Sequence, residues 1–136
     1  MTENNKALVR RMEEELFNKR NLDAVDTFIA PGYVLRTAAD GTPNGRDAIR
    51  SSIAGYLQGF PDLRITIDQL LAVDDRVVGC FTFSGTHRGE LFGMPPTGRS
   101  IAVRQIAIYR IAGGRVVEEW EVSDQLGLMQ QLGAAS

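Results

Sequence analysis

Apolar residues at the start of the chain recur at the spacing of an α-helix. Leu8, Met12 and Leu16 lie four residues apart, and most of the positions between them are polar or charged. This stripe predicts an amphipathic helix over residues 3–18, with one face directed at a core.

Two further helices and a short strand follow in the first half of the chain. Apolar residues share one face over residues 21–29, and the sequence Ala30-Pro31-Gly32 is expected to end that helix. Residues 33–37 have the pattern of a short strand. A third apolar stripe predicts a helix from residue 44 or 45 to about residue 59.

The pattern changes after Asp62 to the alternation that is typical of strands. Four such runs predict the antiparallel strands of a meander, over residues 63–73, 76–87, 100–111 and 115–124. Gly113-Gly114 supplies a two-residue hairpin turn between the last two strands, because glycine accepts positive φ angles. The final run, residues 125–133, fits either a helical turn or a tail.

This order of elements predicts an α+β fold in one domain that spans residues 1–136. Three helices laid across one face of a curved, mainly antiparallel sheet make a half-open cone, and concave sites of this kind bind small molecules. The stretch GTHRGELFGMPPTGRS, residues 85–100, is a long connection between two strands. Its apolar residues Leu91, Phe92 and Met94 are placed to fold over the mouth of the cone as a lid.

Strand parity predicts which side chains of the last two strands face the cone. Pairing Ala112 with Arg115 across the hairpin puts four pairs on one face: Tyr109 with Glu118, Ala107 with Trp120, Gln105 with Val122, and Val103 with Asp124. The opposite face carries the charged residues Arg104, Arg110, Glu119 and Glu121. We therefore expect the Trp120 face to lie inside and the charged face to meet solvent or a partner.

Asp124 is the sharpest candidate for chemistry, because parity puts its carboxylate at a strand end inside an apolar cone. Burial raises the pKa of a carboxyl, which would let Asp124 exchange protons near neutral pH. The alternative role is structural. Asp124 directly precedes QLGLMQQL, and aspartate is a favoured N-cap of a helix. The two roles are compatible, and the residues alone leave both open.

The other pocket candidates are His87, Gln105, Trp120, Tyr33, Arg36, Phe60 and Phe92. His87, the only histidine, is either an acid/base or donor to a substrate, or a half-exposed residue at a strand end. Arg36 is either a ligand for a carbonyl or anionic oxygen or a surface arginine. Trp120 serves the core and the pocket together, since the wall of the cone is the core.

Composition argues against several classes of function. The net charge is −2 and no basic stripe is present, so we expect no nucleic-acid partner. The start of the chain is polar and no apolar run approaches the ~20 residues of a membrane span, so we expect a cytoplasmic protein without a membrane segment. One cysteine and one histidine argue against a disulfide and against a metal site.

The segments GFPDLRITIDQLLAVDDRVVGCFTFSGTHRGELFGMPPTGRSIAV and IYRIAGGRVVEEWEVSDQLGLMQQLG resemble the SnoaL-like polyketide cyclases, also called ester cyclases. The resemblance covers nearly the whole chain. It implies a nuclear transport factor two-like fold, a homodimer, and an intramolecular aldol condensation of an anthracycline precursor without metal or cofactor. It also implies an aspartate acid/base near the end of the last strand, a position that Asp124 matches.

Two departures from the family pattern bear on the activity. The short first strand often carries Asp-His after the tyrosine, where this chain has Leu35-Arg36, and a polar residue is common where it has Ala107. Four hypotheses therefore stand, because one fold hosts many chemistries. They are an aldol-type cyclase with Asp124 as acid/base, a cofactor-free hydroxylase or hydrolase/isomerase, a non-catalytic protein that binds a hydrophobic or aromatic molecule, and a dimerisation module.

Overall fold

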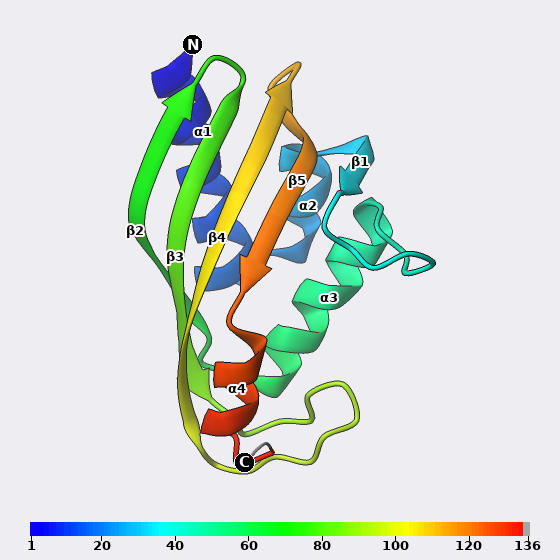
Figure 1. The fold of residues 1–136 in the computed structure, drawn as a ribbon, viewed down its shortest axis with the longest axis vertical. Helices are drawn as coiled ribbons and strands as arrows, with labels where there is room; N and C mark the ends of the chain where they lie inside the picture. The colour runs from blue at the N-terminus through cyan, green and yellow to red at the C-terminus, as the bar shows by residue number, and fades with distance from the viewer. Residues whose placement is uncertain (135–136) are drawn as a thin grey trace.

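The computed structural model describes residues 1–134 and contains one curved five-stranded sheet with helices packed against one face (Figure 1). The strand order is β1-β5-β4-β3-β2, with β1 parallel to β5 and all other neighbours antiparallel. The strands are β1 (Ile29–Leu35), β2 (Arg64–Val73), β3 (Arg76–Thr86), β4 (Ser100–Ala112) and β5 (Arg115–Ser123). The predicted α+β class and the four-stranded meander are confirmed.

The helical segments also follow the predicted order. They are α1 (Thr2–Glu13), η1 (Glu14–Asn18), η2 (Leu22–Ala24), α2 (Val25–Phe28), α3 (Arg46–Gly59) and α4 (Gln125–Gln131). The segment η1 continues α1 as one turn of π-helix, so the first helical region ends at the predicted residue 18. The presence of α4 decides the open question about the C-terminal run, which is helical over residues 125–131.

The second helix ends earlier than the sequence predicts. Helix α2 stops at Phe28, and Ala30-Pro31-Gly32 lies inside β1 rather than after a helix. The sheet accepts Pro31 because β1 is an edge strand, where a missing N–H costs little of the hydrogen-bond ladder. Pairing with β5 is also interrupted between Ile29 and Val34, next to this proline.

The core lies between the first helix and the inner face of the sheet. Leu8, Met12 and Leu16 are buried as their spacing predicts, and they pack in one cluster with Val77 and Phe81 of β3. Burial of side chains of this size stabilises the fold by about 1.5–3 kcal/mol each. This packing fixes the first helix across the sheet and brings the residues at its end over the middle strands.

A β-bulge in β5 reverses the predicted parity of that strand. Ala112 does pair with Arg115, but Ile111 then pairs with Val116 and Arg110 with Glu118, which leaves Val117 as an extra residue. One additional residue turns every later side chain to the other face of the sheet.

The predicted inner face of β5 is therefore wrong. Trp120 and Val122 lie on the outer face of the sheet, where Val122 is 71% exposed. The predicted outer residues Glu119 and Glu121 turn inward instead, and Glu119 is only 6% exposed. The face of β4 was predicted correctly, with Gln105 and Tyr109 inside and Arg104 outside.

Candidate active site

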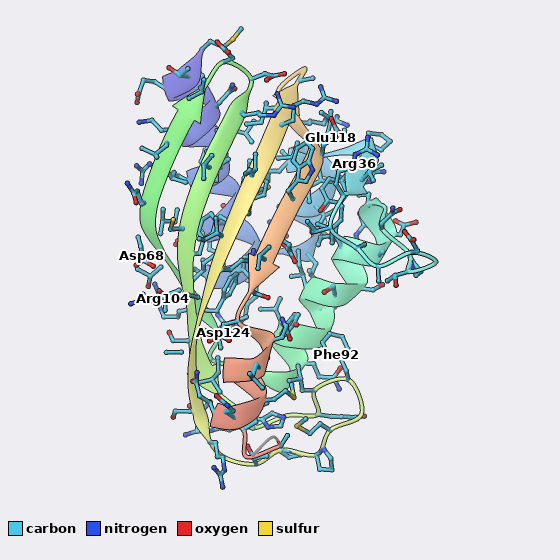
Figure 2. All side chains as sticks on the ribbon, in the orientation of Figure 1. Arg36, Asp68, Phe92, Arg104, Glu118 and Asp124 are labelled. Carbon is cyan, nitrogen blue, oxygen red and sulfur yellow. The ribbon has the colours of Figure 1, made fainter. Side chains whose placement is uncertain are left out.

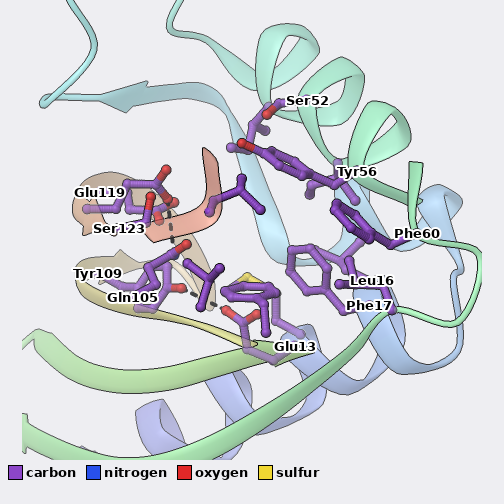
Figure 3. Close-up of a pocket in the computed structure, with 18 of the residues that line it drawn as sticks. Glu13, Leu16, Phe17, Ser52, Tyr56, Phe60, Gln105, Tyr109, Glu119 and Ser123 are labelled. Carbon is purple, nitrogen blue, oxygen red and sulfur yellow. Dashed lines mark hydrogen bonds between the residues drawn. The ribbon is translucent and has the colours of Figure 1, made fainter. Parts of the chain in front are cut away.

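A cavity of about 140 Å³ lies between the inner face of the sheet and the helices (Figure 3). Its two ends differ in character. Leu16, Phe17 and Phe60 belong to an apolar end, and polar side chains that include Tyr109 and Glu119 gather at the other end (Figure 3). None of the described residues that line the cavity is a lysine, arginine or histidine.

Three carboxyl groups face this cavity from two distant parts of the chain. Glu13 comes from the last residue of α1, and Glu119 and Glu121 come from β5. The bulge puts both β5 glutamates on the same inward face, because they are two residues apart on an extended strand. Carboxyl groups in such an environment must be neutralised by protons or by a ligand, since isolated buried charges are costly.

Glu119 is held by a tyrosine from the edge strand. The Tyr33 hydroxyl donates a hydrogen bond of 2.7 Å to Oε1 of Glu119. Burial is the main reason that the pKa of Glu119 lies well above its ordinary value, and the neighbouring carboxyl of Glu121 raises this pKa further. The side-chain amide of Gln105 donates a hydrogen bond of 3.3 Å to Oε2 of Glu121.

Glu13 is held in the same way by a tyrosine of β4. The Tyr109 hydroxyl donates a hydrogen bond of 2.7 Å to Oε1 of Glu13. Burial raises the pKa of Glu13 from 4.5 to about 7, the Tyr109 bond opposes this change, and Glu121 adds to it. The other oxygen, Oε2, is buried and has no hydrogen-bond partner among the described residues.

Glu13 lies where the first helix changes its geometry. The chain changes from α-helix to π-helix directly after this residue. A π-turn widens the helix by one residue, and such turns are frequent at functional sites. Both Glu13 and Leu16 reach the cavity, while Glu14 is exposed.

The model of the SnoaL-like polyketide cyclase family matches residues 7–132. The chain belongs to this family. Its curated relatives include the nogalonic acid methyl ester cyclase of Streptomyces nogalater, which is 28% identical over 121 residues that cover 86% of this chain and 89% of the relative. They also include the aklanonic acid methyl ester cyclase DnrD of Streptomyces peucetius, which is 30% identical over 130 residues that cover 93% of this chain and 88% of the relative.

Solved structures of similar proteins share the fold of this SnoaL-like chain. AclR, a candidate hydroxylase from Streptomyces galilaeus, superimposes with a TM-score of 0.88 at 27% identity, over 100% of this chain and 89% of AclR. A SnoaL-like protein from Jannaschia sp. CCS1 superimposes with a TM-score of 0.85 at 22% identity, over 100% of this chain and 96% of the other. The cone of helices on a curved sheet is thus the nuclear transport factor two-like fold of the family.

Asp124 does not lie in the cavity of this SnoaL-like protein, so the predicted pocket position is wrong. Its side chain is exposed, and Oδ1 accepts a 2.8 Å hydrogen bond from the backbone N–H of Gly127 (Figure 2). This is the N-cap of α4, which confirms the structural alternative. Gly127 suits the cap, because a Cβ there would lie 2.1 Å from Oδ2 of Asp124.

The other predicted pocket residues divide into two groups. Gln105 and Phe60 line the cavity as predicted. Tyr33 does not line it but donates a hydrogen bond to the lining residue Glu119. Trp120 lies on the outer face, where the guanidinium of Arg76 sits 5.6 Å from its ring centre. Arg36 is also outside, in a 2.6 Å ion pair with Glu118, so the surface alternative for Arg36 is confirmed (Figure 2).

His87 anchors the long connection instead of touching the cavity. It is fully buried, and its Nδ1 accepts a hydrogen bond of 3.2 Å from the backbone N–H of Thr97. Its ring lies 5.5 Å from the ring of Phe60. The predictions of a substrate contact and of a half-exposed strand end are both wrong, because the connection folds back over this residue.

Phe92 lies at the outer rim of the site rather than inside it. The side chain is 63% exposed, and its ring meets Tyr56 of α3 edge-on at 5.2 Å (Figure 2). Gly55 makes room for this ring, because a Cβ at that position would lie 2.3 Å from Cε1 of Phe92. Since Tyr56 lines the cavity, Phe92 covers one wall of the site from outside. Leu91, in the same connection, is buried.

Two general findings concern membranes and metals. Within residues 1–134, no helix combines the length and apolar character that crossing a bilayer requires. In the same range, no group of three or more histidine, cysteine, aspartate or glutamate side chains is arranged to hold a metal ion.

Proposed function

We propose that this protein is a cofactor-independent enzyme that closes a carbon ring in an aromatic polyketide ester by an intramolecular aldol reaction. The acid/base group is the carboxyl pair Glu119–Glu121 and not Asp124. The observation that carries the proposal is the cavity itself, in which an apolar end meets a carboxyl cluster without any lysine, arginine or histidine in the described lining. The names of the curated relatives support the reaction class.

The proposed reaction needs a base that works without a metal. A hydrogen between two carbonyl groups of a polyketide is acidic, and its removal gives an enolate that the conjugated substrate delocalises. A carboxylate in an apolar site is a stronger base than one in water, because burial disfavours its charge. Glu119 meets this condition through its burial, and Glu121 lies beside it at hydrogen-bond distance from Gln105.

The pair acts as one unit that holds a single proton. Two adjacent carboxyl groups do not ionise together, since each negative charge raises the pKa of the other group. In the proposed resting state Glu119 keeps the proton and receives the Tyr33 bond, and Glu121 is the proton acceptor that Gln105 positions. Glu121 therefore removes the substrate proton.

Cavity size limits how the substrate enters. A cavity of about 140 Å³ is close in size to one that holds a single benzene ring. We infer that the ring being closed occupies the cavity and that the rest of the polyketide extends outward. Gln125 is both a lining residue and exposed, and it marks the mouth through which the substrate would extend.

The proposal predicts turnover of an anthracycline precursor. Aklanonic acid methyl ester incubated with the protein is expected to give a product of unchanged mass with one additional ring, because an aldol ring closure is an isomerisation. Liquid chromatography with mass spectrometry and proton NMR measures this product. Heat-denatured protein is the control, and a product yield no higher than in that control contradicts the cyclase function.

The likeness to AclR favours a second candidate, cofactor-free hydroxylation, since AclR is a candidate hydroxylase. That reaction begins from the same enolate, whose carbon takes up dioxygen and a proton to form a hydroperoxide, and the hydroperoxide loses water to leave a carbonyl group. A product in which one oxygen has replaced two hydrogens, formed only in air, would assign this activity. Substrate that binds the protein and is recovered unchanged would instead assign a binding role.

We also propose that two copies associate through the outer face of the sheet. Ile106 and Val122 pair across β4 and β5, and they are 54% and 71% exposed. They lie beside Trp120, so the outer face presents a contiguous apolar surface, which on soluble proteins commonly marks an interface. Strand parity predicts Glu119 and Glu121 on this face, and the structure places Trp120 and Val122 there instead.

Replacing Ile106 with lysine is expected to convert the dimer to a monomer. A lysine at that position would place two charges against each other in a symmetric apolar interface. Sedimentation or light scattering measures the mass, and Leu126→Lys on α4, which is also exposed, is the control. A wild-type protein that is monomeric, or an Ile106→Lys variant that remains dimeric, contradicts this interface.

A further inference from the structure

We propose that Glu13 is a second catalytic carboxyl, which protonates the oxygen of the carbonyl group that the enolate attacks. This inference rests on the proposed aldol function and divides it between two groups. The β5 pair takes a proton from carbon, and Glu13 gives a proton to oxygen from the opposite wall.

The geometry of Glu13 places its proton on the oxygen that lacks a partner. Oε1 accepts the Tyr109 hydroxyl bond, so a proton on this carboxyl belongs to Oε2. Oε2 is buried and has no hydrogen-bond partner in the described structure. A buried polar atom without a partner costs stability, and a catalytic role is one explanation for such an atom in a native protein. A substrate carbonyl oxygen in the cavity would supply the missing acceptor.

The groups around Glu13 keep its proton in place. The ionisable groups that face it are Tyr109 of β4, Glu119 and Glu121 of β5, and Tyr33 of β1. All are acids, and the described cavity lining contains no cation to stabilise a carboxylate. The pKa of about 7 agrees with a group that is available as an acid near neutral pH.

The proposed reaction balances in protons and electrons. Glu121 removes the α-hydrogen as a proton, and the electron pair of that C–H bond becomes the enolate. The enolate carbon forms a new bond to the second carbonyl carbon, and the π electrons of that C=O bond move to oxygen. This oxygen takes the proton from Oε2 of Glu13. The excess proton on the β5 pair then returns to Glu13, so the enzyme is restored and the substrate is isomerised.

Two assays separate the two roles. Hydrogen exchange at the α-carbon in D₂O needs only the base, and methyl benzoylacetate serves as the probe because its carbonyls are not placed for ring closure. Ring closure of aklanonic acid methyl ester needs both groups. Glu13→Gln keeps the size of the side chain and an acceptor for Tyr109, but it has no acidic proton. Glu14→Gln, the exposed neighbour, is the matched control.

We expect Glu13→Gln to keep exchange within about threefold of wild type and to lower kcat for ring closure by about 10²–10⁴-fold, the usual contribution of a general acid. KM should change little, and Glu14→Gln should match wild type in both assays. Ring closure retained in Glu13→Gln, or exchange and closure lost by the same factor, overturns the inference.

A second variant keeps the test valid if Glu13→Gln does not fold. In that case Glu13→Asp is measured instead. Its shorter side chain displaces the acid, so ring closure should slow more than exchange. Equal slowing of both steps in that variant also overturns the inference. A wild-type protein that performs neither step contradicts the proposed function and, with it, this role of Glu13. The activity of the wild type therefore distinguishes a failure of the proposed function from a failure of the proposed role of Glu13.

Discussion

Replacement of Glu121 by glutamine is expected to lower kcat for ring closure by about 10²–10⁴-fold, since general acid–base catalysis contributes about that factor. Glutamine has the same size and keeps a hydrogen-bond partner for Gln105, but it cannot accept the substrate proton. KM should remain within a few-fold of wild type, because the apolar wall that holds the substrate is unchanged. Initial rates over a range of substrate concentration measure both constants.

Glu119→Gln distinguishes the pair from a single base. Because Glu119 holds the shared proton in the proposed pair, its neutral amide replacement should leave Glu121 in place as the proton acceptor. We expect a smaller loss of kcat than in Glu121→Gln. Equal kinetics for wild type and both variants would contradict a catalytic role for β5.

Stability is expected to fall as pH rises from about 4.5 to about 7 because of Glu13. In the unfolded chain this carboxyl ionises near 4.5, whereas in the folded protein its pKa is about 7. Between these values the unfolded state binds fewer protons than the folded state, so increasing pH favours unfolding. At about 1.4 kcal/mol per pH unit, the loss is on the order of 3 kcal/mol and is complete above about pH 7.

Urea unfolding at about pH 4.5 and about pH 8 tests this expectation. The wild type should lose more stability between the two pH values than Glu13→Gln, which has no proton to lose at this position. Glu119 also has a raised pKa, so both proteins should retain part of the decline. Glu14→Gln is the control and should follow wild type. A Glu13→Gln curve parallel to that of wild type would falsify the buried-acid account of residue 13.

Much of the fold was predictable because hydrophobic spacing reports which faces are buried. The stripe at Leu8, Met12 and Leu16 located the first helix, and alternation located β2 to β5 to within a residue or two at each end. The bulge at Val117 was not predictable in this way. The Gly113-Gly114 turn fixes the first pair of the hairpin, but a single extra residue further along leaves no mark in composition and reverses the strand.

The candidate site was predicted in part, at Phe60 after α3 and on β4. Gln105 was placed correctly, and the β5 carboxyls were missed because the bulge exchanged the faces of that strand. Glu13 left a visible signal, since it is a charged residue four positions after the buried Val9. Its partner Tyr109 lies 96 residues away, a contact that no local pattern encodes. Asp124 is a favoured residue type for an N-cap and directly precedes the C-terminal helical run, and the N-cap is the role that it has in the structure.

The measurement that tests the central claim most directly is α-hydrogen exchange in D₂O, with methyl benzoylacetate as probe, for Glu121→Gln and Asp124→Asn side by side. Asparagine is also a good N-cap, so Asp124→Asn should preserve α4 while removing the carboxylate. We predict that Asp124→Asn exchanges at the wild-type rate and that Glu121→Gln exchanges no faster than buffer. The reverse pattern, with exchange lost in Asp124→Asn and kept in Glu121→Gln, would contradict an acid/base centre inside the cavity.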